Sequence, residues 1–159
     1  MFKKLLSTRS LCVSAVIAAL YAALTLLLAP ISYGSIQLRI SEAMTLLPLV
    51  LPQAIPGLFV GCLIANLYTG MLTDILFGSL ATLLAAIGTY LLRKKPLLAA
   101  ACPVVANAVI VGLVLAMSAN LPIPLTMLQV ALGEIGAVVL GFILLSALKR
   151  ARIDLTKAI

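Results

Sequence analysis

The residues in this sequence that could do chemistry are a few ionisable and amide side chains set between long apolar runs. Glu134 falls roughly ten residues, or ~15 Å, inside the last apolar run, which corresponds to mid-membrane depth. An unpaired carboxylate at that depth is costly, and no basic residue is placed at a comparable depth. Glu134 is also the only carboxylate placed deep within a run, so we expect it to bind a ligand.

Five further polar residues fall at the ends or in the middle of apolar runs. Arg39 and Glu42 are three residues apart, which places both on one face if their helix begins early enough. Asn66 and Asp74 flank a turn, and Asn107 lies near the middle of a run. Each has a structural alternative: a surface ion pair for Arg39 and Glu42, a helix cap for Asp74, and interhelical hydrogen bonds for the two asparagines.

Several kinds of chemistry are excluded. The chain has no His, which removes HExxH zinc sites and Ser-His-Asp triads. It has neither a GxxxxGK[ST] phosphate loop nor a GxGxxG motif, so active transport would take its energy from a partner or an ion gradient. Cys12, Cys62 and Cys102 are odd in number and embedded in apolar runs, which favours small buried hydrophobes over a disulfide or a metal site. We therefore expect no cofactor and no metal.

The charge distribution indicates an integral protein of the cell membrane. The chain is 64% hydrophobic and 9% charged, and all Lys and Arg residues except Arg39 fall in three clusters at the ends of apolar runs. These clusters are Lys3, Lys4 and Arg9; Arg93, Lys94 and Lys95; and Lys149, Arg150, Arg152 and Lys157. A net charge of +7 suggests nucleic acid in a soluble protein, but at membrane ends it sets orientation and attracts anionic lipids. We expect no nucleic acid partner.

We predict an all-α bundle of six membrane spans in one domain, residues 1–159. A span needs ~20 apolar residues. The predicted spans are residues 11–29, 41–51, 55–68, 74–92, 97–117 and 124–148. Residues 41–68 are divided in two because Pro48, Pro52 and Pro56 interrupt them, and because this division puts every basic cluster on one side. Both termini are then cytosolic, with residues 11–29 a retained helix rather than a signal peptide.

Small residues recur at intervals of four in three of these spans, a spacing that lets helices approach closely. The sets are Ala15, Ala19 and Ala23; Gly57, Gly61 and Ala65; and Gly133, Ala137 and Gly141. We interpret the second and third sets as packing within the bundle. The first set fits either internal packing or an external docking face.

Three stretches of this chain resemble the QueT family, the substrate-binding S components of energy-coupling factor (ECF) transporters. They are Leu38-Arg39-Ile40-Ser41-Glu42-Ala43-Met44-Thr45-Leu46-Leu47-Pro48; Pro56-Gly57-Leu58-Phe59-Val60-Gly61 with Asn66; and Asp74-Ile75-Leu76-Phe77-Gly78-Ser79-Leu80-Ala81-Thr82. The resemblance covers nearly the whole chain. It implies a six-helix bundle that binds a queuosine precursor, a 7-deazaguanine such as preQ1, outside the cell and topples in the membrane to release it inside.

The resemblance also implies partners, namely a transmembrane T component and two ATP-binding cassette ATPases. Ala15, Ala19 and Ala23 are similar to the AxxxA motif by which S components meet the T component. The absence of an ATP-binding motif from this sequence agrees with an importer in which separate ATPases supply the energy.

The side chains suit the implied ligand. A deazaguanine edge offers an N–H beside an exocyclic NH2, a donor pair that a carboxylate such as Glu134 can accept bidentately. Asn107 could pair with the ring carbonyl or a ring nitrogen, and Asp74 or Glu42 with a cationic aminomethyl group. The aromatic side chains available to stack on the ring are Tyr33, Tyr68 and Phe77.

Three alternatives remain open at this point. The chain could be an S component for another vitamin, since unrelated cargoes share the fold. It could be an intramembrane enzyme that uses Asp74 and Glu134, although no catalytic motif supports this. It could also be a structural subunit of a membrane complex, against which the buried Glu134 argues.

Overall fold

The computed structural model describes residues 7–33 and 38–151, and every regular element in those residues is helical. The elements, in chain order, are α2 (Thr8–Leu27), α3 (Ala29–Ser32), the 3₁₀ helix η1 (Ile40–Leu49), α4 (Ala54–Leu67), the π-helical turn η2 (Asp74–Gly78), α5 (Ser79–Leu91), α6 (Pro96–Ala119) and α7 (Ile123–Arg150). Pro52 and Pro122 fall between elements, and Pro30 lies at the start of the short α3, just beyond the end of α2, because proline cannot donate a backbone hydrogen bond. Pro48 and Pro56, by contrast, lie inside η1 and α4 and do not interrupt them.

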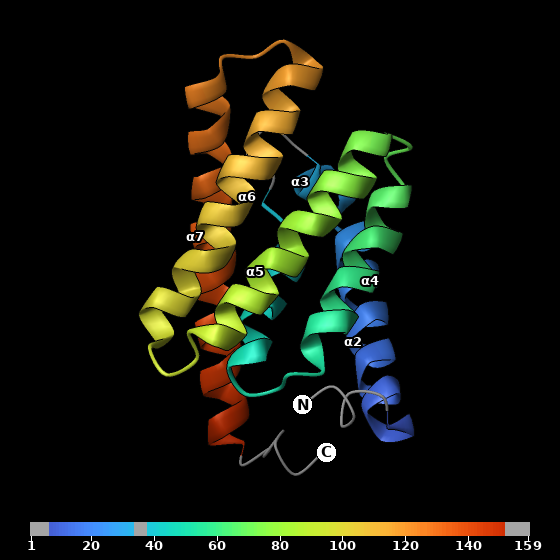
Figure 1. Cartoon of the computed structure of the whole chain (residues 1–159), viewed down its shortest axis with the longest axis vertical. Coiled ribbons are helices and arrows are strands. Elements are labelled where there is room, and N and C mark those ends of the chain that lie inside the picture. The colour runs from blue at the N-terminus through green and yellow to red at the C-terminus, as the bar shows by residue number, and fades with distance from the viewer. Residues whose placement is uncertain (1–6, 34–37, 152–159) are drawn as a thin grey trace.

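The helices form one elongated bundle in which α4, α5, α6 and α7 run alternately up and down (Figure 1). Neighbouring helices pack in the order α2, α4, α5, α6 and α7, and η1 lies behind them against α7, α5 and α2. The start of α2, the α5–α6 turn and the end of α7 lie at one end of the bundle. The α4–η2 connection and the α6–α7 turn lie at the other end.

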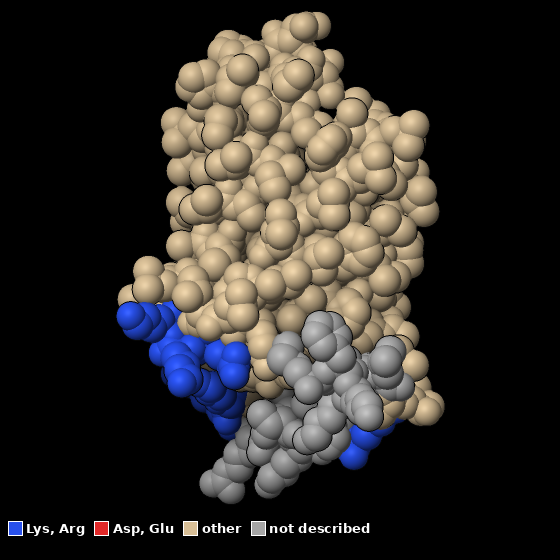
Figure 2. Space-filling model, in the orientation of Figure 1, with Lys and Arg blue, Asp and Glu red and all other residues tan. Residues whose placement is uncertain are grey.

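The basic residues of the described chain gather at the end where α2 begins and α7 finishes. In the view of Figure 2 all visible Lys and Arg side chains lie there, and no Asp or Glu is seen on the face shown. The described members of the three clusters thus share one end of the bundle, as the prediction of a common membrane side requires, whereas Lys3, Lys4, Arg152 and Lys157 lie outside the described residues.

Helix lengths separate long spans from short ones. Residues 8–27, 74–91, 96–119 and 123–150 form four helical stretches long and apolar enough to cross a membrane. The apolar helices η1 and α4 have 10 and 14 residues. Fourteen α-helical residues rise ~21 Å, less than the ~30 Å hydrocarbon core. The all-helical, multi-span prediction is confirmed, whereas six full crossings remain a prediction.

The second predicted helix is present, but it is a 3₁₀ helix with Pro48 inside it. The hydroxyl of Thr45 donates to the carbonyl oxygen of Glu42 at 2.5 Å. In an α-helix that carbonyl would accept from the backbone of Leu46, so the side chain competes with α-helical bonding. The tighter winding also sets which η1 side chains face inward.

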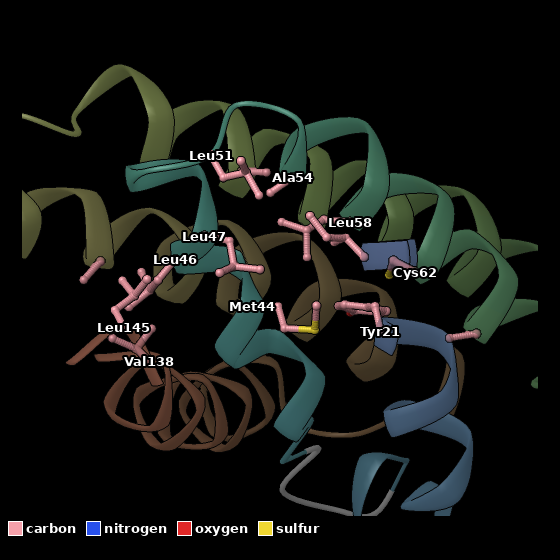
Figure 3. Close-up of a cluster of buried hydrophobic side chains, with 14 residues drawn as sticks. Tyr21, Met44, Leu46, Leu47, Leu51, Ala54, Leu58, Cys62, Val138 and Leu145 are labelled. Carbon is pink, nitrogen blue, oxygen red and sulfur yellow. The ribbon is translucent and has the colours of Figure 1, made fainter. Parts of the chain in front are cut away.

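The core is built where small residues admit neighbouring backbones. A Cβ added at Gly57 would lie 2.6 Å from the Ser14 carbonyl oxygen on α2, and one at Gly141 would lie 2.5 Å from the Ala43 carbonyl oxygen on η1. These contacts agree with our interpretation of the second and third small-residue sets as internal packing. Figure 3 shows the cluster that results, in which Met44 and Leu47 of η1 lie between α2 and α7.

Candidate binding site

A small cavity lies between η1, α6 and α7. Its lining combines four polar residues with two valines: Arg39, Glu42, Asn107, Val111, Val130 and Glu134. The space open to the centre of a water molecule is about 10 Å³, which is room for about one water. All four polar side chains are buried, with between 1% and 6% of their surface exposed. Buried charges at this density are costly in a structural role, so the cavity is the candidate site.

Glu134 lies eleven residues beyond the first residue of α7, close to its predicted depth. Asn107 of α6 donates from Nδ2 to Glu134 Oε1 at 2.7 Å. The second carboxylate oxygen, Oε2, is buried and has no hydrogen-bond partner in the described residues. Glu134 therefore keeps one free oxygen and one unused lone pair on the other.

Glu42 is the second carboxylate of the cavity. The hydroxyl of Tyr21 on α2 donates to Glu42 Oε1, and the hydroxyl of Thr82 on α5 donates to the same oxygen at 3.1 Å. Its Oε2 is buried and without a partner in the described part of the chain. The expectation that Glu134 is the only deep carboxylate is therefore wrong, because the fold buries Glu42 to 1% exposure.

Arg39 lies deep in the protein as well, and not in a surface ion pair. Its side chain is 6% exposed and lines the cavity with both carboxylates. The guanidinium carbon lies 5.3 Å from the ring centroid of Tyr33, and Nη1 lies 4.0 Å from the sulfur of Cys62. The expectation that no basic side chain is placed near Glu134 is thus wrong. Arg39 is the residue immediately before η1, so η1 positions both Arg39 and Glu42 at the cavity.

Sequence reasoning missed Tyr21 and Thr82, which fix Glu42. A signal was present in α2, where Ser10, Ser14, Tyr21 and Thr25 recur at intervals of four, seven and four residues and are all buried. Such spacing puts hydroxyl groups on one helix face. A polar stripe on an otherwise apolar span indicates a face turned toward the protein interior.

Asn66 and Asp74, two other predicted site residues, lie outside the cavity lining. Asn66 is buried but donates from Nδ2 to the Asp74 carbonyl oxygen at 2.9 Å, which ties α4 to the π-helical turn. Asp74 is half-buried in the first turn of η2, where a carboxylate interacts favourably with the helix dipole.

The aromatic candidates also lie away from the cavity lining. Tyr68 is 68% exposed and its ring stacks on Tyr33, with centroids 5.9 Å apart. Phe77 is 47% exposed. Of the three rings, Tyr33 is the one connected to the site, through its contact with Arg39.

The predicted docking residues Ala15, Ala19 and Ala23 are all exposed on α2. Their neighbours Ala18 and Ala22 are buried on the opposite side of the helix. The first small-residue set therefore forms an outward face and takes no part in internal packing.

The comparison with known proteins decides the family. A model of the QueT transporter family matches residues 11–150, nearly the whole of the described helical chain. The chain belongs to the QueT transporter family. A protein named queuosine precursor transporter QueT, from Lactococcus lactis subsp. cremoris (strain MG1363), is 29% identical over 158 residues, which cover 90% of this chain and 93% of that protein. No solved structure matches the chain.

Family membership selects among the alternatives. The chain is a multi-pass transporter of the cell membrane and not an enzyme. The fold agrees, because Asp74 does not line the cavity that contains Glu134. A pair of carboxylates does face one space, but the pair is Glu42 and Glu134.

Proposed function

We propose that this chain is the S component of an ECF importer and captures a queuosine precursor of the 7-deazaguanine class. The observation that carries the proposal is the buried cavity, where two carboxylates, one guanidinium and one amide meet between three helices. A planar base with several donors and acceptors can satisfy such groups together. The name of the related protein from Lactococcus lactis supports the ligand class.

The chemistry assigns a role to each polar group. Glu134 accepts the N–H and NH2 of the guanine-like edge through its free Oε2 and the remaining lone pair of Oε1. Asn107 holds Glu134 in position and reaches the same edge of the ring. Arg39 donates to the ring carbonyl from the opposite side of the cavity.

Ligand entry requires the helices to separate. The present cavity has room for about one water, and a bicyclic base is several times larger. The element best suited to move is η1, because it is short, is wound as a 3₁₀ helix, contains Glu42 and follows directly on Arg39. We therefore expect ligand binding to enlarge the cavity by a movement of η1.

The importer assembles through the outward face of α2. Exposed alanines at positions 15, 19 and 23 let a helix of the T component approach closely, and two ATPases supply the energy that this chain cannot. An apolar groove between α2, η1 and α7 lies next to this face and extends the surface. The loaded S component then topples in the membrane to release its ligand inside.

Orientation follows from the basic end of the bundle. We expect that end, with both termini, to face the cytosol. In a variant lacking the three native cysteines, Lys94→Cys and Asn120→Cys should react with a membrane-impermeant thiol reagent from opposite sides. Reaction of both from the same side of the membrane would exclude this topology.

The ligand class is tested by calorimetric titration of the purified protein. A panel of 7-deazaguanines, guanine and unrelated vitamins should give binding for the 7-deazaguanines, weaker binding for guanine and none for the vitamins. An S component for another vitamin predicts the reverse order. Asp74→Asn is the matched control, because it changes a carboxylate outside the cavity and should leave the affinities unchanged.

A further inference from the structure

The charges around the cavity do not balance within the chain. Glu42 and Glu134 each bring a carboxylate, Arg39 brings one guanidinium, and the other lining residues are neutral. Arg39 forms no ion pair with either carboxylate within the described residues. With all three groups ionised, the cavity has a surplus of one negative charge. Burying such a surplus is unfavourable, and it is relieved either by a proton on one carboxyl group or by a cation that joins the site.

Unused hydrogen-bonding capacity distinguishes the two carboxylates. Glu42 Oε1 already accepts from Tyr21 and from Thr82, so its free acceptor is the single oxygen Oε2. Glu134 Oε1 accepts from Asn107 alone, and its Oε2 is free, so both of its oxygens remain available. A two-donor ring edge therefore fits Glu134, and a group that offers one point charge fits Glu42.

Glu42 is also held in place for this task. Tyr21 is fully buried on α2, and Thr82 is fully buried on α5, so two helices fix one oxygen from outside the cavity. The other oxygen is left inside the protein with no partner among the residues described. An ammonium group on a flexible arm can reach a single oxygen without matching a planar geometry.

From these observations we propose that Glu42 is the specificity-determining residue for an ammonium group on the ligand. The protein then prefers a singly cationic 7-deazaguanine, such as the 7-aminomethyl compound, over a neutral one of similar size, such as the 7-cyano compound. This inference rests on the proposed function. It goes beyond that function because it assigns different roles to the two carboxylates.

The test compares the two congeners by calorimetry on the full-length protein. Wild type should bind the aminomethyl compound roughly ten- to a hundred-fold more tightly than the cyano compound, the range expected for one charge-assisted contact. Glu42→Gln should bring the ratio of the two affinities close to one. Glu134→Gln should weaken both compounds and leave the ratio near its wild-type value.

The outcomes separate this inference from the function it rests on. Equal affinity of wild type for both congeners overturns the role of Glu42 and leaves the ligand class intact. Binding of neither compound overturns both. An unchanged ratio in Glu42→Gln also overturns the role of Glu42. If Glu42→Gln does not fold, Glu42→Asp is the second variant, because the shorter side chain keeps the charge but moves it away from the cavity. A ratio of the two affinities equal to that of wild type in Glu42→Asp then counts against the proposal.

Discussion

Two regions of the bundle bury polar and small residues for different reasons. In the α2–α4 contact the groups are neutral and the backbones are close: a Cβ at Gly57 would lie 2.6 Å from the Ser14 carbonyl oxygen, and the Ser14 hydroxyl donates to the Gln53 carbonyl oxygen at 2.9 Å. Gln53 Oε1 is buried without a partner in the described chain, but it belongs to an uncharged amide. In the cavity between η1, α6 and α7, Glu42 and Glu134 each keep a buried oxygen without a partner in the described chain.

The difference shows how a structural contact can be distinguished from a ligand site in a membrane protein. Both regions are buried and both depart from an apolar composition, so burial alone does not separate them. Small residues that are tightly packed against a neighbouring backbone indicate a close contact between two helices. Charged residues with unused hydrogen-bonding capacity specify a partner that comes from outside the chain.

The largest expected effect comes from filling the α2–α4 contact. Gly57→Leu places a side chain where its first carbon already meets the backbone of α2, so the two helices must separate. Overpacking of a rigid contact costs about 1–3 kcal/mol and more where backbone must move. We expect a strongly lowered melting temperature in detergent and a loss of ligand binding with it. Ala19→Leu, on the exposed side of α2, should melt like wild type.

An effect on transport alone is expected from the outward face of the same helix. Ala19→Trp should leave ligand binding to the isolated protein intact and abolish uptake by the complete importer, because a bulky side chain blocks close approach of the T component. Uptake in cells and titration of purified protein provide the two measurements. Uptake at the wild-type rate would show that the alanine face meets only lipid.

A smaller and more local effect is expected in the cavity. Glu134→Gln removes the charge and replaces an acceptor oxygen with a donor, which should weaken 7-deazaguanine binding by about 1.5–3 kcal/mol, or roughly ten- to a hundred-fold. The melting temperature of the ligand-free protein should not fall, because a buried amide costs less than a buried charge. Unchanged affinity in the folded variant would assign Glu134 a structural role and remove the contrast between the two regions.

Much of the fold could be predicted because each membrane span is specified by one continuous apolar stretch of sequence. Apolar runs and prolines predicted the order of the helices and the break near Pro52, which the structure reproduces, although Pro48 and Pro56 lie inside η1 and α4. The described residues of the basic clusters share one end of the bundle. The type of η1 could not be predicted, because it depends on a side-chain hydrogen bond of Thr45 that competes with the backbone.

The site could be predicted only in part. Glu134 stood out because a carboxylate in the middle of an apolar run needs an explanation wherever the helix points. Asn107, Glu42 and Arg39 were named as candidates, but Asn66, Asp74 and Tyr68 were named with equal weight and lie outside the cavity lining. Spans that are apolar on every side carry little periodicity, so the sequence gives no direct measure of which side faces inward.

The sequence by itself therefore determined the class of protein, its family, the order of its helices and Glu134 as a carboxylate inside an apolar run. The tertiary structure alone decided that Glu42 and Arg39 share a cavity with Glu134 and that Tyr21 and Thr82 hold Glu42. The physical reason is that these residues come from separate helices. Their meeting depends on helix rotation and on approach distances set by glycines at distant contacts, which no local stretch of sequence specifies.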